Sequence, residues 1–295
     1  MRGHMDLLVE RIAAFSDGAL GGNPAGVAIL DALPDAAVMQ AAAAEVGYSE
    51  TAFAAPEGSA WRVRYFAPSV EVDFCGHATI ALGAALARRF GDNAFALRLN
   101  RADIVVQGWA GEAGTRAALV SPPTWSQPAG DRLAATALDL FALSPEDLDP
   151  RIPPALAHAG ADHLVLALHD RARLAAIRYE LERGRALAAA EGITTFSLIH
   201  AEAPRRFHAR NPFPIGGVYE DPATGAAAAA LGGYLRDLGW PHGGSIEIVQ
   251  GEDMGARSRL MVEIGPVAGE GVRVLGDARS LAGPDAAPAG PGGRG

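Results

Sequence analysis

The chain has 295 residues, enough for two domains of about 150 residues that each contain a hydrophobic core. Apolar residues make up 49% and charged residues 20%, which predicts a folded globular protein, and the net charge of -9 argues against nucleic acid or an anionic membrane as a partner. All 25 basic residues are arginine, so mechanisms that need a lysine are excluded, including pyridoxal phosphate Schiff bases, Schiff-base aldolases and Walker A phosphate loops.

The single cysteine, Cys75, excludes an intrachain disulfide, a zinc ribbon and a CxxC redox motif. The apolar run at residues 7–9 is too short for a signal peptide, and no stretch approaches the ~20 apolar residues that span a bilayer. We therefore expect a cytoplasmic protein with no membrane partner and no nucleic-acid partner.

The first half of the chain predicts a β-rich domain. Apolar and alternating stretches predict strands over residues 7–15, 27–30, 49–55, 61–66 and 71–74. A Gly/Pro-rich turn connects the first two strands, and an Ala-rich stretch with Pro34 in its first turn predicts a helix over residues 34–44.

A sharp turn at residues 75–77 leads into the most informative helix of this half. The helix is predicted to run through residue 89 and to end before Gly91. Its residues are small and apolar on every side, so we expect it to be buried rather than amphipathic.

The second half repeats this pattern. Residues 221–225 form a predicted turn, and a helix of small residues follows over 226–238 and ends before Gly239. Strands are expected over residues 163–169 and 193–200, with a helical stretch between them.

The two halves therefore resemble each other. The helix-start glycines, Gly76 and Gly225, are about half the chain apart, and an Asn-Pro pair interpreted as a turn precedes each helix, at residues 23–24 and 211–212. We interpret this as an internal duplication: two pseudo-symmetric domains, each with β-strands around a central buried helix, and with the helix starts facing each other across an interdomain cleft. The alternative is that a glycine followed by a helix of small residues occurs twice by chance in an Ala- and Gly-rich chain.

The predicted domain bounds follow from this interpretation. The N-terminal half-domain covers residues 1–124 and the C-terminal half-domain covers residues 125–281. An alternative is that the last strand, near residues 272–281, pairs with the strands of the N-terminal half-domain. The remaining residues, 282–295, are rich in Gly, Pro and Ala and are predicted to be disordered.

Glu50 is the first candidate for catalysis. It lies among small and aromatic residues in a predicted strand, and a partly desolvated carboxylate there can both take and return a proton. The alternative is an exposed glutamate on the polar face of an alternating strand.

The turn Cys75-Gly76-His77 is the second candidate. Gly76 allows backbone conformations that are closed to other residues, and the N–H groups of the following helix start can hold an anion. His77 is then available to donate or accept one hydrogen bond. The alternative is a capping histidine beside a buried structural cysteine.

Asp221 and the following helix start form the third candidate. The carboxylate of Asp221 can bind a substrate amine or hydroxyl, while the amides of Gly225 and Ala226 bind a carboxylate. The alternative is an ordinary helix cap with a proline in the turn.

The sequence offers little support for metal or dinucleotide chemistry. The six other histidines considered form no HExxH motif and no tight metal pattern: His158, His163, His169, His200, His208 and His242. Neither a GxGxxG motif after a strand nor a GxSxG elbow is found. We expect no cofactor and no metal.

Five sequence motifs occur in the same order, and with roughly the same spacing, as the motifs of one protein family. They are Gly22-Asn23-Pro24-Ala25-Gly26-Val27, Tyr48-Ser49-Glu50-Thr51-Ala52-Phe53, Arg64-Tyr65-Phe66-Ala67-Pro68, Glu71-Val72-Asp73-Phe74-Cys75-Gly76-His77-Ala78-Thr79 and Glu220-Asp221-Pro222-Ala223-Thr224-Gly225. The chain resembles the PhzF-like phenazine-biosynthesis isomerases from about residue 9 to about residue 279. The resemblance implies an α+β, diaminopimelate-epimerase-like fold and a homodimer.

The resemblance also implies an activity. The characterised family member acts on trans-2,3-dihydro-3-hydroxyanthranilate, and a single glutamate moves a proton within the ring. By motif, that glutamate is Glu50. His77 and Asp221 match the family's other polar active-site positions, and Gly76 matches a glycine that lines the site.

Two departures bear on the substrate and the chemistry. Where the family often has TGSA, this chain has Thr224-Gly225-Ala226-Ala227, so Ala226 replaces a side-chain hydroxyl with a methyl group. Related two-thiol epimerases need a cysteine on each side of the substrate, whereas Cys75 has no counterpart in the second half. Stereoinversion by paired thiols is therefore excluded.

Three functions are compared. The leading hypothesis is a cofactor-independent isomerase that shifts a proton, and with it a double bond, in a small cyclic or amino-acid-like carboxylic acid. The second is a non-catalytic protein that binds a small carboxylate on the same fold. The third, a metal-dependent or hydrolytic enzyme, has no support in the sequence. Glu50 discriminates the first two, because a binding protein has no reason to desolvate a carboxylate beside its ligand.

Overall fold

The computed structural model describes residues 7–111 and 114–281, which fall into two compact units. Of the described residues, the first unit contains those from 7 to 119 together with 275–281, and the second unit contains residues 120–274. The predicted tail, residues 282–295, lies outside the described residues. Among the described helices, none is long and apolar enough to cross a membrane.

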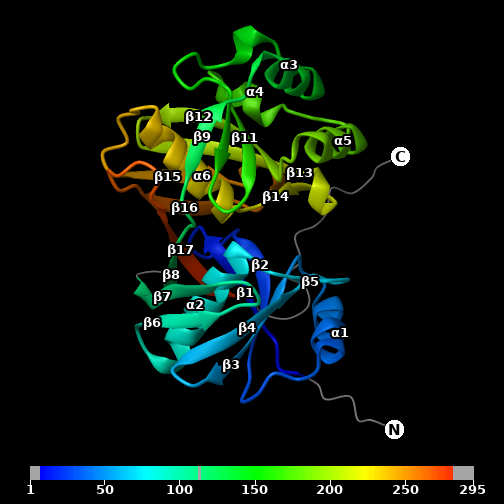
Figure 1. The fold of residues 1–295 in the computed structure, drawn as a ribbon, viewed down its shortest axis with the longest axis vertical. Coiled ribbons are helices and arrows are strands. Elements are labelled where there is room, and N and C mark those ends of the chain that lie inside the picture. Colours follow the sequence, from blue (N-terminus) through cyan, green and yellow to red (C-terminus); the bar gives the residue numbers. More distant parts are fainter. Residues whose placement is uncertain (1–6, 112–113, 282–295) are drawn as a thin grey trace. The chain divides into compact units, whose positions relative to one another are not determined.

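The first unit is a β-barrel that closes around one helix (Figure 1). Its strands are β1 (Glu10–Ser16), β2 (Asn23–Ile29), β3 (Thr51–Glu57), β4 (Ala60–Phe66), β5 (Glu71–Val72), β6 (Asn93–Arg98), β7 (Asp103–Gly111), β8 (Gly114–Val120) and β17 (Arg273–Ser280). They pair in the order β17–β1–β2–β3–β4–β6–β7–β8, and β8 pairs back to β17. The β2–β3 and β4–β6 pairs are parallel, and the short β5 pairs with β4.

Helix α2 (Gly76–Phe90) packs against the strands of this barrel, and all of its residues from 77 to 87 are buried, as the sequence predicts. Small residues make the close approach possible. A Cβ atom on Gly83 of α2 would lie 2.5 Å from Cγ2 of Val106, and one on Gly108 of β7 would overlap the carbonyl oxygen of Gly83. The helix and β7 are therefore in direct backbone contact, which a larger residue at either glycine would prevent.

Helix α1 (Ala36–Val46) packs on another part of the first unit. Met39 and Ala43 lie in a cluster of buried residues that includes Phe53 of β3. The helix begins two residues later than predicted because Asp35, after Pro34, takes the extended N-cap conformation, and Gly47 ends it with a left-handed φ of 72°.

The second unit has the same order of strand pairing. Its strands are β9 (Trp125–Pro128), β10 (Ala155–His158), β11 (Asp162–Ala167), β12 (Thr195–Ala203), β13 (Arg206–Phe213), β14 (Val218–Asp221), β15 (Ser245–Gln250) and β16 (Ser258–Glu263). They pair in the order β9–β10–β11–β12–β13–β15–β16, with β11–β12 and β13–β15 parallel and β14 on β13. From β17 to β7, the first unit shows the same succession of antiparallel and parallel pairs.

Helix α6 (Gly225–Asp237) occupies the place of α2 in the second unit. Its residues from 227 to 235 are buried, and it contacts β9, β10, β11 and β16. Gly232, as far from Gly225 as Gly83 is from Gly76, faces Val262 of β16, where a Cβ atom would lie 2.8 Å from Cγ1. The two central helices thus pack on their sheets through a glycine at the same helical position.

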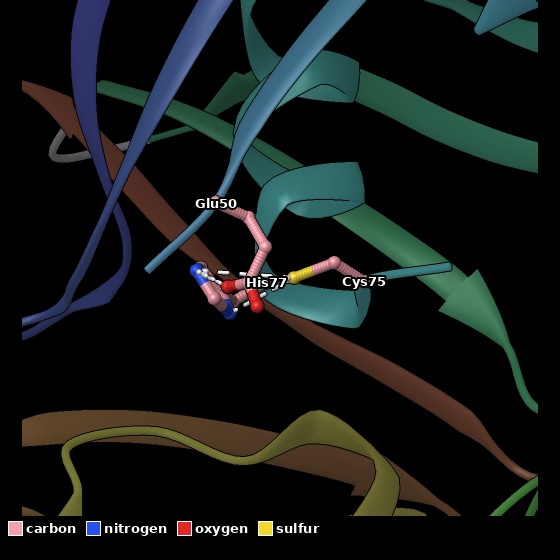
Figure 2. A group of neighbouring side chains, drawn as sticks. All are labelled: Glu50, Cys75 and His77. Atoms are coloured by element: carbon pink, nitrogen blue, oxygen red, sulfur yellow. Dashed lines mark hydrogen bonds and ion pairs between the residues drawn. The ribbon is translucent and has the colours of Figure 1, made fainter. Parts of the chain in front are cut away.

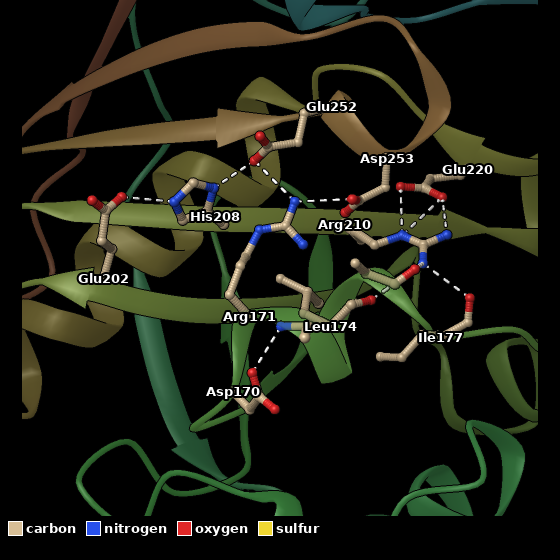
Figure 3. Close-up of polar contacts among 12 residues, drawn as sticks. Asp170, Arg171, Leu174, Ile177, Glu202, His208, Arg210, Glu220, Glu252 and Asp253 are labelled. Carbon is tan, nitrogen blue, oxygen red and sulfur yellow. Dashed lines mark hydrogen bonds and ion pairs between the residues drawn. The ribbon is translucent and has the colours of Figure 1, made fainter.

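An arginine–glutamate ion pair is also repeated. Arg64 of β4 donates from Nε and Nη2 to the two carboxylate oxygens of Glu71 in β5, at 2.7 and 2.5 Å. Arg210 of β13 makes the same kind of pair with Glu220 of β14, with Nη2 and Oε2 2.6 Å apart (Figure 3). Each glutamate stands equally far before its helix-start glycine, so each pair fixes the short strand that leads into a central helix.

The interpretation of the two Asn-Pro pairs as equivalent turns is wrong. Asn23 and Pro24 lie in β2, and Asn211 and Pro212 lie in β13, which corresponds to β4. Pro212 is tolerated in a strand because the pairing with β14 is irregular between residues 211 and 213.

A second hydrophobic cluster fills the outer part of the second unit. Three helices contribute residues to it: α3 (Asp131–Leu140), α4 (Arg171–Ala175) and α5 (Leu181–Glu191). Elsewhere in this unit, 3₁₀ turns lie at Pro145–Asp147, Pro214–Gly216 and Glu252–Met254. Phe141 and Phe196 meet edge to face in this cluster, with ring centroids 5.3 Å apart.

Candidate active site

Glu50 lies directly before β3, at the end of the barrel where α2 begins. Its backbone oxygen accepts a hydrogen bond from the Gly26 amide at 3.1 Å, which ties it to β2. Its side chain is 19% exposed. The carboxylate is therefore half-buried, rather than lying on a solvated strand face.

Cys75 and His77 reach the same place from the start of α2 (Figure 2). Nε2 of His77 lies 3.5 Å from Oε2 of Glu50, and Sγ of Cys75 donates to the same oxygen at 3.5 Å. Sγ of Cys75 is also 3.3 Å from Nδ1 of His77, and both of these side chains are buried. The structure thus brings together three residues that the sequence singled out in two separate segments.

Neighbouring hydroxyl groups that were not predicted as site residues support this group. Oγ of Ser49 lies 3.3 Å from Nε2 of His77. Thr79 donates to the backbone oxygen of Cys75 at 2.7 Å, and its Oγ1 is 2.7 Å from the hydroxyl of Tyr65, whose pKa is raised by burial. The available signals were local ones: Ser49 adjoins Glu50, and Thr79 is one helical turn after Cys75.

The start of α2 can bind an anion. The first N–H groups of a helix have no partner within the helix, and the side chain of the N-cap residue, Cys75, does not cap them in α2. A Cβ atom on Gly76 would meet only the ring edge of Phe74, at 4.0 Å, so the backbone here is open to a ligand. A carboxylate bound to these amides would lie beside Glu50.

The second unit places Asp221 at the end of β14, just before α6. Oγ1 of Thr224 donates to Oδ2 of Asp221 at 2.5 Å, and this contact fixes the carboxylate against the turn. Gly225 and Ala226 begin α6 and are partly buried, and the side chain of the N-cap residue, Thr224, does not cap the first turn of this helix. The turn therefore places a carboxylate directly before the first amides of α6.

Gln250, the last residue of β15, holds this turn in place and was not predicted from the sequence. Its Nε2 donates to the backbone oxygen of Asp221 at 2.7 Å and to Oγ1 of Thr224 at 3.0 Å, and its Oε1 accepts from the Thr224 amide at 3.2 Å. Gln250 is buried. Because its partners are distant in the sequence, no local pattern indicates this role.

The predicted site residues thus form two groups. The first unit gathers Glu50, Cys75, Gly76 and His77, and the second gathers Asp221, Gly225 and Ala226. That both groups line one interdomain cleft stays a prediction.

The first group also has the composition of a metal site. Among the described residues, Glu50, Cys75 and His77 are the one set of three potential ligands whose donor atoms lie within 4.8 Å of one another. The sequence did not reveal this set, because Glu50 comes from a different segment than the other two.

The sequence profile described as "Phenazine biosynthesis-like protein" (PhzC-PhzF) matches residues 12–282. This chain belongs to that family. An uncharacterized isomerase of Deinococcus radiodurans is 32% identical over 265 residues, a region that covers 86% of this chain and 85% of the relative.

Solved structures share the fold of this PhzC-PhzF chain. A PhzF-family phenazine biosynthesis protein of Bacillus anthracis superposes with a TM-score of 0.81 at 22% identity, covering 93% of this chain and 97% of the other. A probable proline racemase of Agrobacterium radiobacter gives a TM-score of 0.61 at 10% identity, covering 92% and 90%. The predicted α+β, diaminopimelate-epimerase-like fold is confirmed.

Proposed function

We propose that this family member is an isomerase that moves a proton, and with it a double bond, within a small cyclic or amino-acid-like carboxylic acid. The observation that carries the proposal is the position of Glu50, a half-buried carboxylate within 3.5 Å of both His77 and Cys75 at an open helix start. The relatives' name of isomerase supports the same conclusion.

Each residue has a part in the proposed reaction. Glu50 takes the proton from one carbon of the substrate and returns it to another, so no second base and no cofactor are needed. His77 holds the Glu50 carboxylate and donates or accepts one hydrogen bond with the substrate. The amides that begin at Gly76 and Gly225 bind the substrate carboxylate, and Asp221 binds its amine or hydroxyl group.

The N-cap positions of the two central helices argue for single-base chemistry. Cys75 is the N-cap of α2, and the N-cap of α6 is Thr224. A threonine hydroxyl does not replace the second thiol of a two-thiol racemase, because it is a far weaker acid. This excludes inversion by paired thiols, and proton transfer by one base on one face of the substrate is the reaction that we propose in its place.

The substrate class follows from the same site. By its resemblance, the family points to trans-2,3-dihydro-3-hydroxyanthranilate or a similar acid. In this chain Ala226 provides a backbone amide but no hydroxyl at the α6 start, so we expect a substrate that needs one fewer donor there. The homodimer and the cytoplasmic location inferred from the sequence belong to this proposal as well.

The proposal is tested by incubating the protein in heavy water with a panel of small cyclic and amino-acid-like acids that includes trans-2,3-dihydro-3-hydroxyanthranilate. NMR then detects deuterium incorporation or a shifted double bond. We expect one class of acids to react with the native chain and not with Glu50→Gln. Acids that bind tightly without any exchange or shift would instead favour the non-catalytic carboxylate-binding protein.

A further inference from the structure

Three donor atoms at the proposed active site are arranged as one face of a zinc coordination sphere. Oε2 of Glu50 lies 3.5 Å from both Nε2 of His77 and Sγ of Cys75, and Nε2 and Sγ are 3.9 Å apart. The nearest point equally distant from these three atoms lies in their plane, about 2.1 Å from each, and a point displaced to the tetrahedral position lies about 2.2 Å from each, which agrees with the Zn–N, Zn–O and Zn–S bond lengths of about 2.0–2.3 Å.

The chemistry of the donors selects the kind of metal. A thiolate, an imidazole and a carboxylate together suit zinc, whereas magnesium and calcium require oxygen ligands. The thiolate and the carboxylate also balance the two positive charges of the ion. Three protein ligands leave a fourth tetrahedral position, which water or the carboxylate of a ligand takes in such sites.

We propose that Glu50, Cys75 and His77 bind one zinc ion, and that zinc bound there inhibits the isomerase. The inhibitory effect rests on the proposed function: zinc on Oε2 of Glu50 withdraws electron density from the carboxylate, which makes it a weaker base for the substrate proton, and the ion blocks the approach to that oxygen. The binding itself rests on geometry alone. Zinc and proton transfer then compete for the same oxygen atom, and removing zinc restores turnover.

Binding is measured first, without any substrate. Co²⁺ is titrated into the metal-free protein, because thiolate coordination gives a charge-transfer absorption in the near ultraviolet that coordination by nitrogen and oxygen alone does not. We expect this band to saturate at one Co²⁺ per chain and to be removed by Zn²⁺. A missing band, together with no stoichiometric Zn²⁺ binding in a competition with a chromophoric chelator, would overturn the proposal.

Variants assign the ligands. Cys75→Ala should abolish the band, and Glu50→Gln and His77→Gln should each weaken Zn²⁺ binding by roughly tenfold or more, since loss of even an indirect partner of a ligand costs that much. His208→Gln is the matched control. Its two ring nitrogens each face a different carboxylate, Glu252 and Glu202, on opposite sides of the ring, so they do not converge on one ion (Figure 3). Equal loss of binding in the control would contradict the assignment.

Inhibition is measured separately, with native protein and any accepted substrate in heavy water. Adding Zn²⁺ at the concentration that fills the site should slow proton exchange, and a chelator should restore it. Zinc binding without inhibition would overturn the inhibitory role alone. Activity that a chelator abolishes and Zn²⁺ restores would overturn both this role and the proposed metal-independent mechanism. Absence of zinc binding leaves the proposed isomerase untouched, so the two failures are distinguishable.

Discussion

Oε2 of Glu50 lies 3.5 Å from Nε2 of His77, although β3, β4 and β5 lie between the two residues in the sequence. The backbone of each of these two residues is held in place by the secondary structure around it. The backbone oxygen of Glu50 accepts a hydrogen bond from Gly26 of β2, and His77 belongs to the first turn of a helix that is buried from residue 77 to residue 87. A carboxylate held in this way can meet a substrate without a conformational search, which is what an efficient general acid–base needs.

Gly76→Ala should impair ligand binding but leave the fold intact. A Cβ atom at this position has room in the protein, so the melting temperature should change little. The methyl group would, however, stand where an anion approaches the amides at the start of α2. We expect weaker binding of a substrate-like acid and slower turnover, measured by calorimetry and by proton exchange in heavy water.

Gly108→Ala is the matched control for this prediction. Its methyl group would overlap the carbonyl oxygen of Gly83, and neither backbone can move without separating α2 from β7. The free energy of unfolding should fall by ~1–3 kcal/mol or more. If Gly76→Ala destabilised the protein as strongly as Gly108→Ala, the open space at the helix start would be refuted.

The two repeated ion pairs should differ in their contribution to stability. The side chains of Arg210 and Glu220 are about 5% exposed, and Arg210 also donates to backbone oxygens of α4 and of Ile177. Glu220→Gln would leave a buried guanidinium without its counter-charge and should cost ~3–5 kcal/mol. Glu71→Gln, in the half-buried pair, should cost ~1 kcal/mol or less. Denaturant unfolding of both variants measures the difference, and equal costs would contradict it.

His163 should make the protein less stable in mild acid. Burial lowers the pKa of His163 to about 4, whereas the ordinary value is 6.5. Between these two values the unfolded chain binds a proton that the folded chain does not, so the stability present above pH 6.5 is lost as the pH falls toward 4. For this shift, the loss is about 3 kcal/mol. Unfolding of the native protein and of His163→Gln across this range should show a shallower pH dependence in the variant; identical slopes would rule out this contribution.

Much of the fold could be predicted because its signals are local. The central helices, α2 and α6, consist almost entirely of small apolar residues and begin at glycines, so their burial and their starting points followed from composition and turn chemistry. The repeat was visible for the same reason. The pair Asn211-Pro212 was wrongly interpreted as a turn, because an irregularity in the β13–β14 pairing accommodates the proline within a strand. No local sequence pattern indicates such an irregularity.

The candidate site was predictable only in part. Glu50, Cys75 and His77 were singled out separately, but their convergence into one set of donors depends on how β2, β3 and α2 meet. The role of Gln250 was not predicted, because its three hydrogen bonds are made with residues that are far away in the sequence. The arginine–glutamate pairs did leave a signal: each glutamate precedes its helix-start glycine by the same distance.

The most direct test of single-base proton transfer compares Glu50→Gln with Cys75→Ala, using any accepted substrate in heavy water. Glu50→Gln keeps the shape and most hydrogen bonds of the side chain but removes the oxygen that titrates. Its turnover should fall by ~10²–10⁴ or more, with little change in affinity for a substrate-like acid. Cys75→Ala should cost far less, because one thiol does not complete a two-base reaction. If Cys75→Ala abolished turnover and Glu50→Gln left it intact, the assignment of Glu50 as the base would be contradicted.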